Sequence, residues 1–222
     1  MEYRKHTSLK DLAQALGVSI PTVSRALKDS PEISRELCAK AKELAKEMNY
    51  RPNPFAMSLR KNAPRIIGVI VPDIVTHFFA SILNGIENMA IANGYFVIIT
   101  TSHESYEHEK RNVENLVNMR VEGIIACLSQ ETTDYSHFAA LKDINMPLIL
   151  FDRVCLTEQF SSVVADGVQS AQMATQHLLD NGSKRVAFIG GANHLDIVKK
   201  RKHGYLEALR DNRIPIEKEL VV

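Results

Sequence analysis

Tryptophan, long apolar runs and closely spaced cysteines are all missing from this sequence. No window approaches the roughly 18 uncharged apolar residues of a membrane span, and the opening M-E-Y-R-K-H lacks the apolar core of a signal peptide. We therefore expect a cytoplasmic protein without a membrane partner. The cysteines, Cys38, Cys127 and Cys155, are odd in number and lie in apolar surroundings, which favours reduced core thiols over a disulfide framework or a metal site.

A strong net charge is also absent, but the charges are unevenly placed. The chain carries +1 overall, yet residues 1–62 hold 12 Lys+Arg against 7 Asp+Glu, and residues 63–222 hold 15 against 19. Residues 1–62 can therefore bind the phosphates of a nucleic acid, while the acidic remainder of the chain keeps the protein soluble. Prolines at 51–54 and 61–64 interrupt any continuous helix between the two regions. Two domains joined by a short connector follow.

The basic region has the pattern of three helices. Ser8 can cap a first helix that Gly17 ends. Ser19 can cap a second helix, with Pro21 in the first turn, where a missing N–H costs nothing. Apolar residues at three- and four-residue steps predict a third helix at about 32–49. Three helices with a tight turn between the first two predict a helix-turn-helix unit. In such units the second helix lies in the DNA major groove.

The second helix therefore supplies most of the predicted DNA contacts. The residues expected against base edges are Ile20, Pro21 and Arg25, with Arg25 able to form a bidentate pair with guanine. The residues expected to bond phosphates, with outward side chains, are Ser8, Ser19, Thr22 and Ser24. On the helix pattern alone, a small three-helix bundle with an incidental arginine is the alternative.

The basic region also resembles a known family. It reads S-L-K-D-L-A-Q-A-L-G-V-S-I-P-T-V-S-R-A-L-K-D-S-P-E-I-S and later A-K-E-M-N-Y-R-P-N. This is similar to the DNA-binding headpiece of the lactose/galactose repressor family of bacterial transcription regulators, over nearly all of the first 60 residues. The T-V-S-R segment and the later N-Y-R-P-N are highly specific.

The connector has a helix signal of its own. Asn53 can cap, and Pro54 can begin, a helix of fewer than two turns, which is marginal in water without a partner. The resemblance implies a hinge helix that folds only when two protomers sit on an operator, with Leu59 wedged into the minor groove and Ala56 packed nearby. We count Asn53 and Arg60 among the DNA-binding candidates as well. The alternative is an ordinary linker with a buried leucine.

From residue 66 the apolar pattern changes period. Helical stretches near 79–93, 107–120 and 134–144 separate four apolar runs of strand length. These runs are Ile66–Val71, Tyr95–Thr100, Gly123–Cys127 and Pro147–Phe151. Strands that are apolar on both faces and alternate with helices predict a parallel sheet covered on both sides. Ligands of such sheets bind at the carboxyl ends of the strands.

Polar and aromatic residues gather at those strand ends. Asp73 with His77-Phe78-Phe79 follows the first strand, and Asp152-Arg153 follows the fourth. An aromatic pair beside an aspartate suits a sugar or a nucleoside, because ring faces stack on C–H surfaces and a carboxylate accepts hydroxyl hydrogen bonds. The alternatives are that Phe78 or Phe79 belongs to the core and that Asp152 and Arg153 form a surface pair.

No catalytic set and no cofactor motif assembles from this region. The tract H-E-S-Y-E-H-E at 103–109 resembles a metal site only superficially, because a spacing of five puts its histidines off a common helix face, so a solvated helix start is favoured. A strand is expected at 185–189, followed by Gly190-Gly191. The G-x-G-x-x-G pattern is absent, which disfavours dinucleotide binding.

The family resemblance extends through this region, from G-V-I-V-P-D-I-V-T-H-F-F-A to R-K-H-G-Y-L-E-A-L, in the family's order. It implies an effector domain like the sugar-binding proteins, with Phe78 and Phe79 in the pocket, Asp152 binding the effector and Arg201 gripping it. His77 departs from the commoner Asn-Pro of that loop. Such domains have two lobes, and the sequence stops soon after the second lobe's second helix, so we expect an incomplete chain.

The sequence thus predicts a helix-turn-helix headpiece plus an α/β effector domain like the periplasmic binding proteins. The expected segments are the headpiece at 1–52, the hinge at 53–63, the first lobe at 64–163 and the start of the second lobe at 164–222. The expected protein is a dimeric, effector-controlled regulator of carbohydrate-use genes that binds operator DNA. A sugar receptor with a non-specific DNA anchor is the alternative. A Rossmann-type enzyme is disfavoured, because it would need a phosphate loop or an acid/base pair and neither is visible in the sequence.

Overall fold

The computed structural model describes residues 7–50 and 65–222. The chain divides into two compact units, residues 1–62 and 63–222. The predicted hinge contacts, Asn53, Ala56, Leu59 and Arg60, lie outside the described residues. No helix among the described residues has the length and apolar character that crossing a membrane requires.

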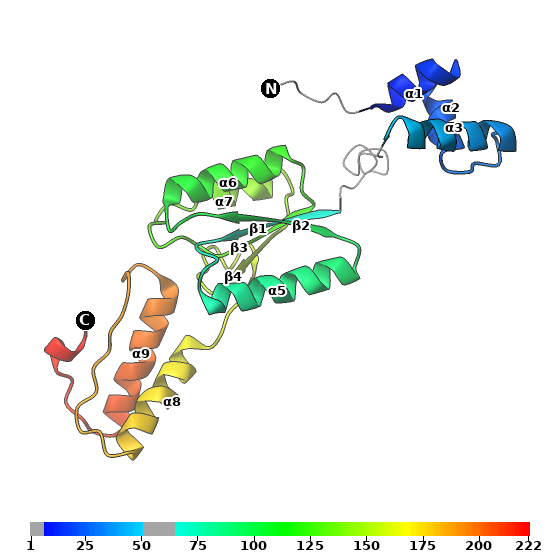
Figure 1. Ribbon diagram of the computed structural model, residues 1–222. Helices are drawn as coiled ribbons and strands as arrows, with labels where there is room; N and C mark the ends of the chain where they lie inside the picture. The colour runs from blue at the N-terminus through cyan, green and yellow to red at the C-terminus, as the bar shows by residue number, and fades with distance from the viewer. Residues whose placement is uncertain (1–6, 51–64) are drawn as a thin grey trace, which may run out of the picture. The chain divides into compact units, whose positions relative to one another are not determined.

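The first unit is a three-helix headpiece, with α1 at Leu9–Leu16, α2 at Ile20–Ala26 and α3 at Arg35–Glu47 (Figure 1). Ser8 and Asp11 form a reciprocal capping box on α1, and Gly17 ends that helix at φ +64°. The Ser19 side chain caps α2. The predicted start of the third helix near residue 32 is wrong by three residues, because Ser34 is the residue that caps it.

The second unit is built on a five-stranded parallel sheet in the order β2-β1-β3-β4-β5. The strands are β1 Ile66–Val71, β2 Phe96–Thr101, β3 Gly123–Ala126, β4 Leu148–Phe151 and β5 Ser161–Val163. The edge strand β5 was not predicted, because its three residues are exposed and two are serines. The chain leaves β1 in one direction to β2 and resumes on its other side at β3. The order therefore reverses at β1, and crevices for ligands form at such a point.

Helices cover both faces of the sheet (Figure 1): α5, at His77–Ala92, lies on one face, and α6 Tyr106–Asn118 and α7 Ser136–Asp143 lie on the other. On the α5 face, Phe79 and Leu83 pack against Val69 and Val71. Leu116 of α6 and Phe138 of α7 belong to the core of the opposite face. Gly68 gives α6 its close approach, since a Cβ there would lie 2.6 Å from Leu116 Cδ1.

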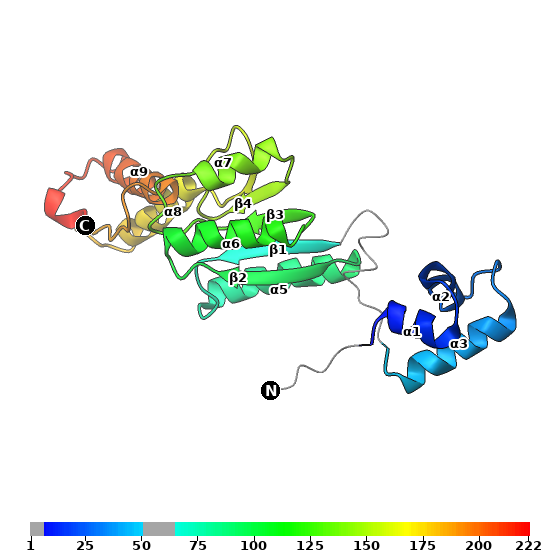
Figure 2. The same ribbon diagram turned by 90° about the horizontal axis from the view of Figure 1, so that it is seen from above.

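After β5 the chain forms α8 at Gly167–Asp180, α9 at Asp196–Asp211 and a 3₁₀ turn at Lys218–Leu220. Helices α8 and α9 pack side by side (Figures 1 and 2). Gly204 permits this, because a Cβ there would overlap the carbonyl oxygen of Val168. The predicted strand at 185–189 is wrong: backbone pairing in the described chain begins only at Phe188, which forms an isolated parallel bridge with Val221 and exchanges hydrogen bonds with Leu220 and Val222.

Candidate functional site

Helix α2 presents its leading end to solvent. Ile20 is 43% exposed, Pro21 is exposed, and the Arg25 side chain is half-exposed one turn later. Thr22 is partly buried, and its hydroxyl lies 2.8 Å from the Ser19 hydroxyl. The helix therefore offers two apolar contacts and one guanidinium along the face that a groove would meet.

Arg25 already has an anionic partner within the headpiece. Its Nη1 donates to Glu32 Oε2 at 2.6 Å, and both side chains are at least half-exposed. Exposed pairs of this kind are weak, because water screens both charges. The guanidinium can therefore exchange the carboxylate for another acceptor.

Ser24 does not lie outward as predicted. It is only 7% exposed and shares the inner arc of α2 with Val23 and Ala26. Because the short helix packs against both α1 and α3, its buried arc is wide enough to include this position. The outward orientation expected for Ser24 is therefore wrong, and its hydroxyl is not presented to a phosphate as Ser8 and Ser19 are.

The aromatic pair after β1 divides between solvent and core. Phe78 is 50% exposed, whereas Phe79 is 6% exposed and stacks edge-to-face with Phe151 at 6.4 Å between ring centroids. The core alternative thus describes the surroundings of Phe79. In the preceding loop, Asp73 accepts a hydrogen bond from the Val75 N–H at 2.9 Å, and His77 is exposed at the start of α5.

Asp152 directly follows β4 and carries a carboxyl group with a shifted pKa. It adopts φ +56°, a left-handed conformation that Asp and Asn tolerate better than most residues. Partial burial raises the pKa of its carboxyl, and the positive charges of Arg153 and Arg201 act in the opposite direction on that pKa. The pKa of the Asp152 carboxyl thus responds to the charge of Arg201, another predicted effector residue.

Arg153 is ion-paired with Glu104 rather than with its neighbour Asp152. Its Nη1 lies 2.7 Å from Glu104 Oε2 and donates to the Leu128 carbonyl at 3.3 Å. The same Glu104 oxygen accepts from the Gln130 N–H at 2.6 Å. One carboxylate thus links the segments that follow β2, β3 and β4.

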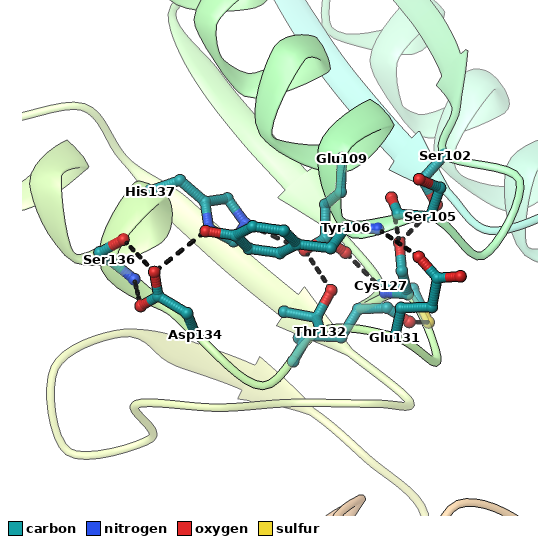
Figure 3. A network of polar contacts seen from close by, with 12 residues as sticks. Ser102, Ser105, Tyr106, Glu109, Cys127, Glu131, Thr132, Asp134, Ser136 and His137 are labelled. Carbon is teal, nitrogen blue, oxygen red and sulfur yellow. Dashed lines mark hydrogen bonds and ion pairs between the residues drawn. The ribbon is translucent and has the colours of Figure 1, made fainter.

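Glu109 is the centre of a buried polar network that was not predicted from the sequence (Figure 3). Glu109 is 0% exposed, and its carboxylate accepts from the Ser129 N–H, from Thr132 Oγ1 at 2.7 Å and from His137 Nε2 at 2.9 Å. The expectation of a solvated helix start is wrong at Glu109. The signal was present, because positions 109, 113 and 116 fall on one helix face and Val113 and Leu116 are apolar.

Metal and thiol chemistry find no support in the described residues. Within 7–50 and 65–222, no group of three or more His, Cys, Asp or Glu side chains is arranged to hold a metal ion. Burial raises the pKa of the Cys127 thiol to about 12 and that of Cys155 to about 12, and Cys38 is also a buried free thiol. Cys127 and Cys155 therefore stay protonated and unreactive at neutral pH.

Comparison with known proteins identifies both units. Residues 8–53 match the model of the bacterial regulatory proteins of the lacI family. Residues 65–222 match the model of periplasmic binding proteins and the sugar binding domain of the LacI family.

Catabolite control protein A of Priestia megaterium is 32% identical, over 98% of this chain and 65% of that protein. The ribose operon repressor of Bacillus subtilis is 31% identical, over 95% of this chain and 62% of that protein. A crystal structure of the lac repressor dimer bound to operator and the anti-inducer ONPF aligns with a TM-score of 0.73 at 25% identity, over 95% of this chain and 64% of the other. The chain thus spans less than two thirds of the length of each of these relatives.

Proposed function

The chain belongs to the LacI family of bacterial regulatory proteins, and we propose that it is a sequence-specific transcriptional regulator, a repressor of carbohydrate-use genes controlled by a small-molecule effector. The observation that carries this proposal is the capped helix α2, which exposes Ile20, Pro21 and Arg25 along one face. Relatives named for repression of a ribose operon and for catabolite control support the carbohydrate assignment.

In this proposal, different residues of the headpiece contact the DNA phosphates and the base edges. Ser8 and Ser19, at the helix N-termini, bond the phosphate backbone, where N–H groups and the helix dipoles also favour negative charge. Arg25 leaves Glu32 and pairs with a guanine in the major groove. The hinge at 53–63, through Asn53, Ala56, Leu59 and Arg60, adds minor-groove contacts and bends the duplex.

The second unit holds the effector. Asp152 and Arg201 have opposite charges and influence each other, so a polyhydroxy ligand between them would accept from the guanidinium and donate to the carboxylate. Phe78 supplies an exposed ring for stacking at the same edge of the sheet, with Asp73 and Phe79 nearby in sequence. Residues 64–163 form the first lobe, and 164–222 begin the second.

Two copies of the chain act together in this proposal. Helix α5 and strand β2 expose apolar side chains that a partner would cover, namely Met89, Ile91 and Phe96. A two-fold homodimer places two headpieces on a pseudo-palindromic operator. Effector binding would change the spacing of the two hinges, and by linkage DNA would change effector affinity by the same factor. The protein would act in the cytoplasm and would not be an enzyme.

Operator selection from random duplexes, at fixed salt and with a panel of sugars and nucleosides, tests the proposal. We expect recovery of a palindrome whose occupancy one ligand changes. Binding without sequence preference would contradict it and leave a sugar-binding protein with a non-specific DNA anchor. A salt titration on the selected operator and on random DNA separates the two results. Phosphate contacts set how steeply affinity falls with salt, and base contacts set the difference in affinity between the two DNAs.

A further inference from the structure

Arg65 begins the second unit in a left-handed backbone conformation. It is the first residue that the structure describes after residues 51–64, it directly precedes β1, and its φ is +41°. This conformation has a steric cost for most residues that carry a Cβ. Residues persist in it where several contacts hold them, and an observed case points to a functional constraint. Glycine would adopt this φ without strain, whereas arginine can offset the cost only through its contacts.

Contacts with two neighbouring segments hold Arg65 in place. Its N–H donates to Glu122 Oε1 at 3.1 Å, and its carbonyl accepts from the Phe96 N–H at 2.9 Å. Its Nη1 donates to the Asn93 carbonyl at 3.3 Å, and its guanidinium carbon lies 5.9 Å from the centre of the Tyr95 ring. At this distance a guanidinium is attracted by an aromatic face. One residue thus joins the start of β1 to the turn before β2 and to the residue before β3.

Tyr95 and Glu122 also contact each other. The Tyr95 hydroxyl donates to the Glu122 carboxylate, and this hydrogen bond is the main cause that raises the pKa of Tyr95. The Glu122 N–H donates to the Ile66 carbonyl at 2.7 Å, so the acceptor of the Arg65 N–H is itself fixed to β1. Gly94 leaves room for the guanidinium, because a Cβ there would lie 3.0 Å from Arg65 Nη1. We call Arg65, Tyr95 and Glu122 the Arg65 cluster.

The Arg65 cluster lies at the edge of the sheet opposite the predicted effector residues. The parallel strands β1, β2 and β3 begin at this edge, whereas Asp73 and Asp152 follow the carboxyl ends of β1 and β4. The cluster also adjoins the apolar surface that the proposed homodimer covers. The turn that holds the guanidinium connects α5, which exposes Met89 and Ile91, to β2, which begins with the exposed Phe96. The cluster therefore links the start of the lobe to the surface that a second copy would cover.

We propose that Arg65 is a positioning residue that determines which separation of two DNA half-sites the dimer accepts. This inference rests on the proposed function, since it needs a homodimer on a palindromic operator. The two copies of Arg65, held beside the dimer surface, fix where the two connectors start. Fixed starting points give the second headpiece a high effective concentration at one half-site spacing and a low one at others. Without the side chain, operators of different spacing would bind more equally.

Binding of the whole chain to the selected operator, and to operators with one base pair inserted or removed at the centre, tests the proposal at fixed salt. The parent chain should prefer one spacing. Arg65→Gly keeps the backbone contacts and relieves the strain, so the chain should fold. Its affinity for the selected operator should fall about tenfold, and its preference among spacings should fall by a similar factor. Affinity for random DNA should change by no more than about twofold, because the phosphate contacts of the headpiece remain.

Arg120→Gly is the matched control. Arg120 is also an exposed arginine with a left-handed backbone, at φ +56°, and its side chain forms no hydrogen bond or ion pair with any residue that the structure describes. This change removes an equal charge and a similar strain, so operator affinity and spacing preference should stay within about twofold of the parent. Tyr95→Leu removes the ring beside the guanidinium and should relax the spacing preference as Arg65→Gly does. The double variant should be no worse than Arg65→Gly, because both changes break one contact.

Urea unfolding without DNA tests the cluster separately from the regulator. Both glycine variants lose an equal charge and gain the same backbone freedom, so Arg65→Gly should unfold at a lower urea concentration than Arg120→Gly. Equal midpoints would overturn the cluster. Parent-like spacing preference in Arg65→Gly, or an equal loss in Arg120→Gly, would overturn the positioning role. A chain that selects no palindrome would refute the proposed function and the positioning role with it, whereas the urea comparison would still decide whether the cluster holds Arg65.

Discussion

Glu32 holds the guanidinium of Arg25 at 2.6 Å in the free headpiece, so the arginine proposed to read a base must exchange one acceptor for another when DNA binds. If Arg25 binds a guanine as proposed, the Glu32 carboxylate would compete with that base and would repel nearby phosphates. We therefore expect Glu32 to lower DNA affinity, and only modestly, because exposed ion pairs are weak.

Glu32→Gln should raise affinity for both the selected operator and random DNA, by about two- to fivefold, as expected for an exposed pair. Glu36→Gln is the control, because it breaks the exposed Glu36–Lys40 pair at 2.9 Å and changes the net charge equally. Fluorescence anisotropy over a salt series measures both. A Glu32 variant that gains no more affinity than the Glu36 variant would show that the pair does not restrain Arg25.

Arg25→Ala should cost about 1–3 kcal/mol on the selected operator and little on random DNA, because a base contact is lost and backbone contacts remain. Arg35→Ala, at the start of α3, is the control, because it removes an equal charge from an exposed position outside α2. Binding to operators altered one base at a time locates the base. Equal losses on operator and random DNA would refute base reading by Arg25.

Glu109→Gln should lower the free energy of unfolding by about 1–3 kcal/mol, because buried donors lose a charged acceptor. The amide oxygen can replace either the carboxylate oxygen that Thr132 and His137 share or the one that accepts from the Ser129 N–H, so the NH₂ group faces at least one donor. Glu107→Gln, on the exposed side of the same helix, should change little. Urea unfolding of both variants makes the comparison, and equal stabilities would mean that the network contributes nothing net.

Asp152→Asn should stabilise the free protein slightly at pH 7 and should weaken effector binding. Burial raises the pKa of this carboxyl in the folded state, so the ionised form is disfavoured there and its cost is present above the pKa. As pH falls below the raised pKa of the folded state the difference between variant and parent should shrink, and below the ordinary pKa of the unfolded chain it should vanish. Asn tolerates φ +56°, so the backbone should not change. Melting temperatures from pH 3 to 7 follow the effect, and a gap that widens toward acid would contradict the sign.

Gly204→Ala should destabilise the α8–α9 pair by about 1–3 kcal/mol, because the added methyl overlaps the Val168 carbonyl and backbone must shift. Gly85→Ala, in α5, is the matched control, since nothing lies within 4 Å of its Cβ position. That change should be stabilising by about 0.5–1 kcal/mol through helix propensity. Chemical unfolding measures both, and a neutral Gly204 variant would show that the two helices can separate without cost.

Local features of the sequence were predictable because their causes lie within a few residues. Ser8, Ser19 and Gly17 mark helix ends through contacts with their own helices. The two-sided apolar runs of β1 to β4 identified a covered parallel sheet, with boundaries accurate to one residue. The left-handed backbone at Asp152 and the strand at β5 carried no comparable signal, since a three-residue edge strand of mostly polar residues is set by its neighbour β4.

The sequence by itself determined the three helices of the first unit, with Arg25 on the outer face of α2, the strands β1 to β4 with the helices between them, and the family. Only the tertiary structure decided how individual side chains are used: Ser24 turned inward, Phe79 buried while Phe78 stayed exposed, and Arg153 paired with Glu104. Periodicity specifies which face of an element is apolar, but the width of the buried arc depends on how many distant elements pack against it. The polar partner of a buried or half-buried charge is chosen in the same way, by segments far apart in the chain that the sheet brings to one edge.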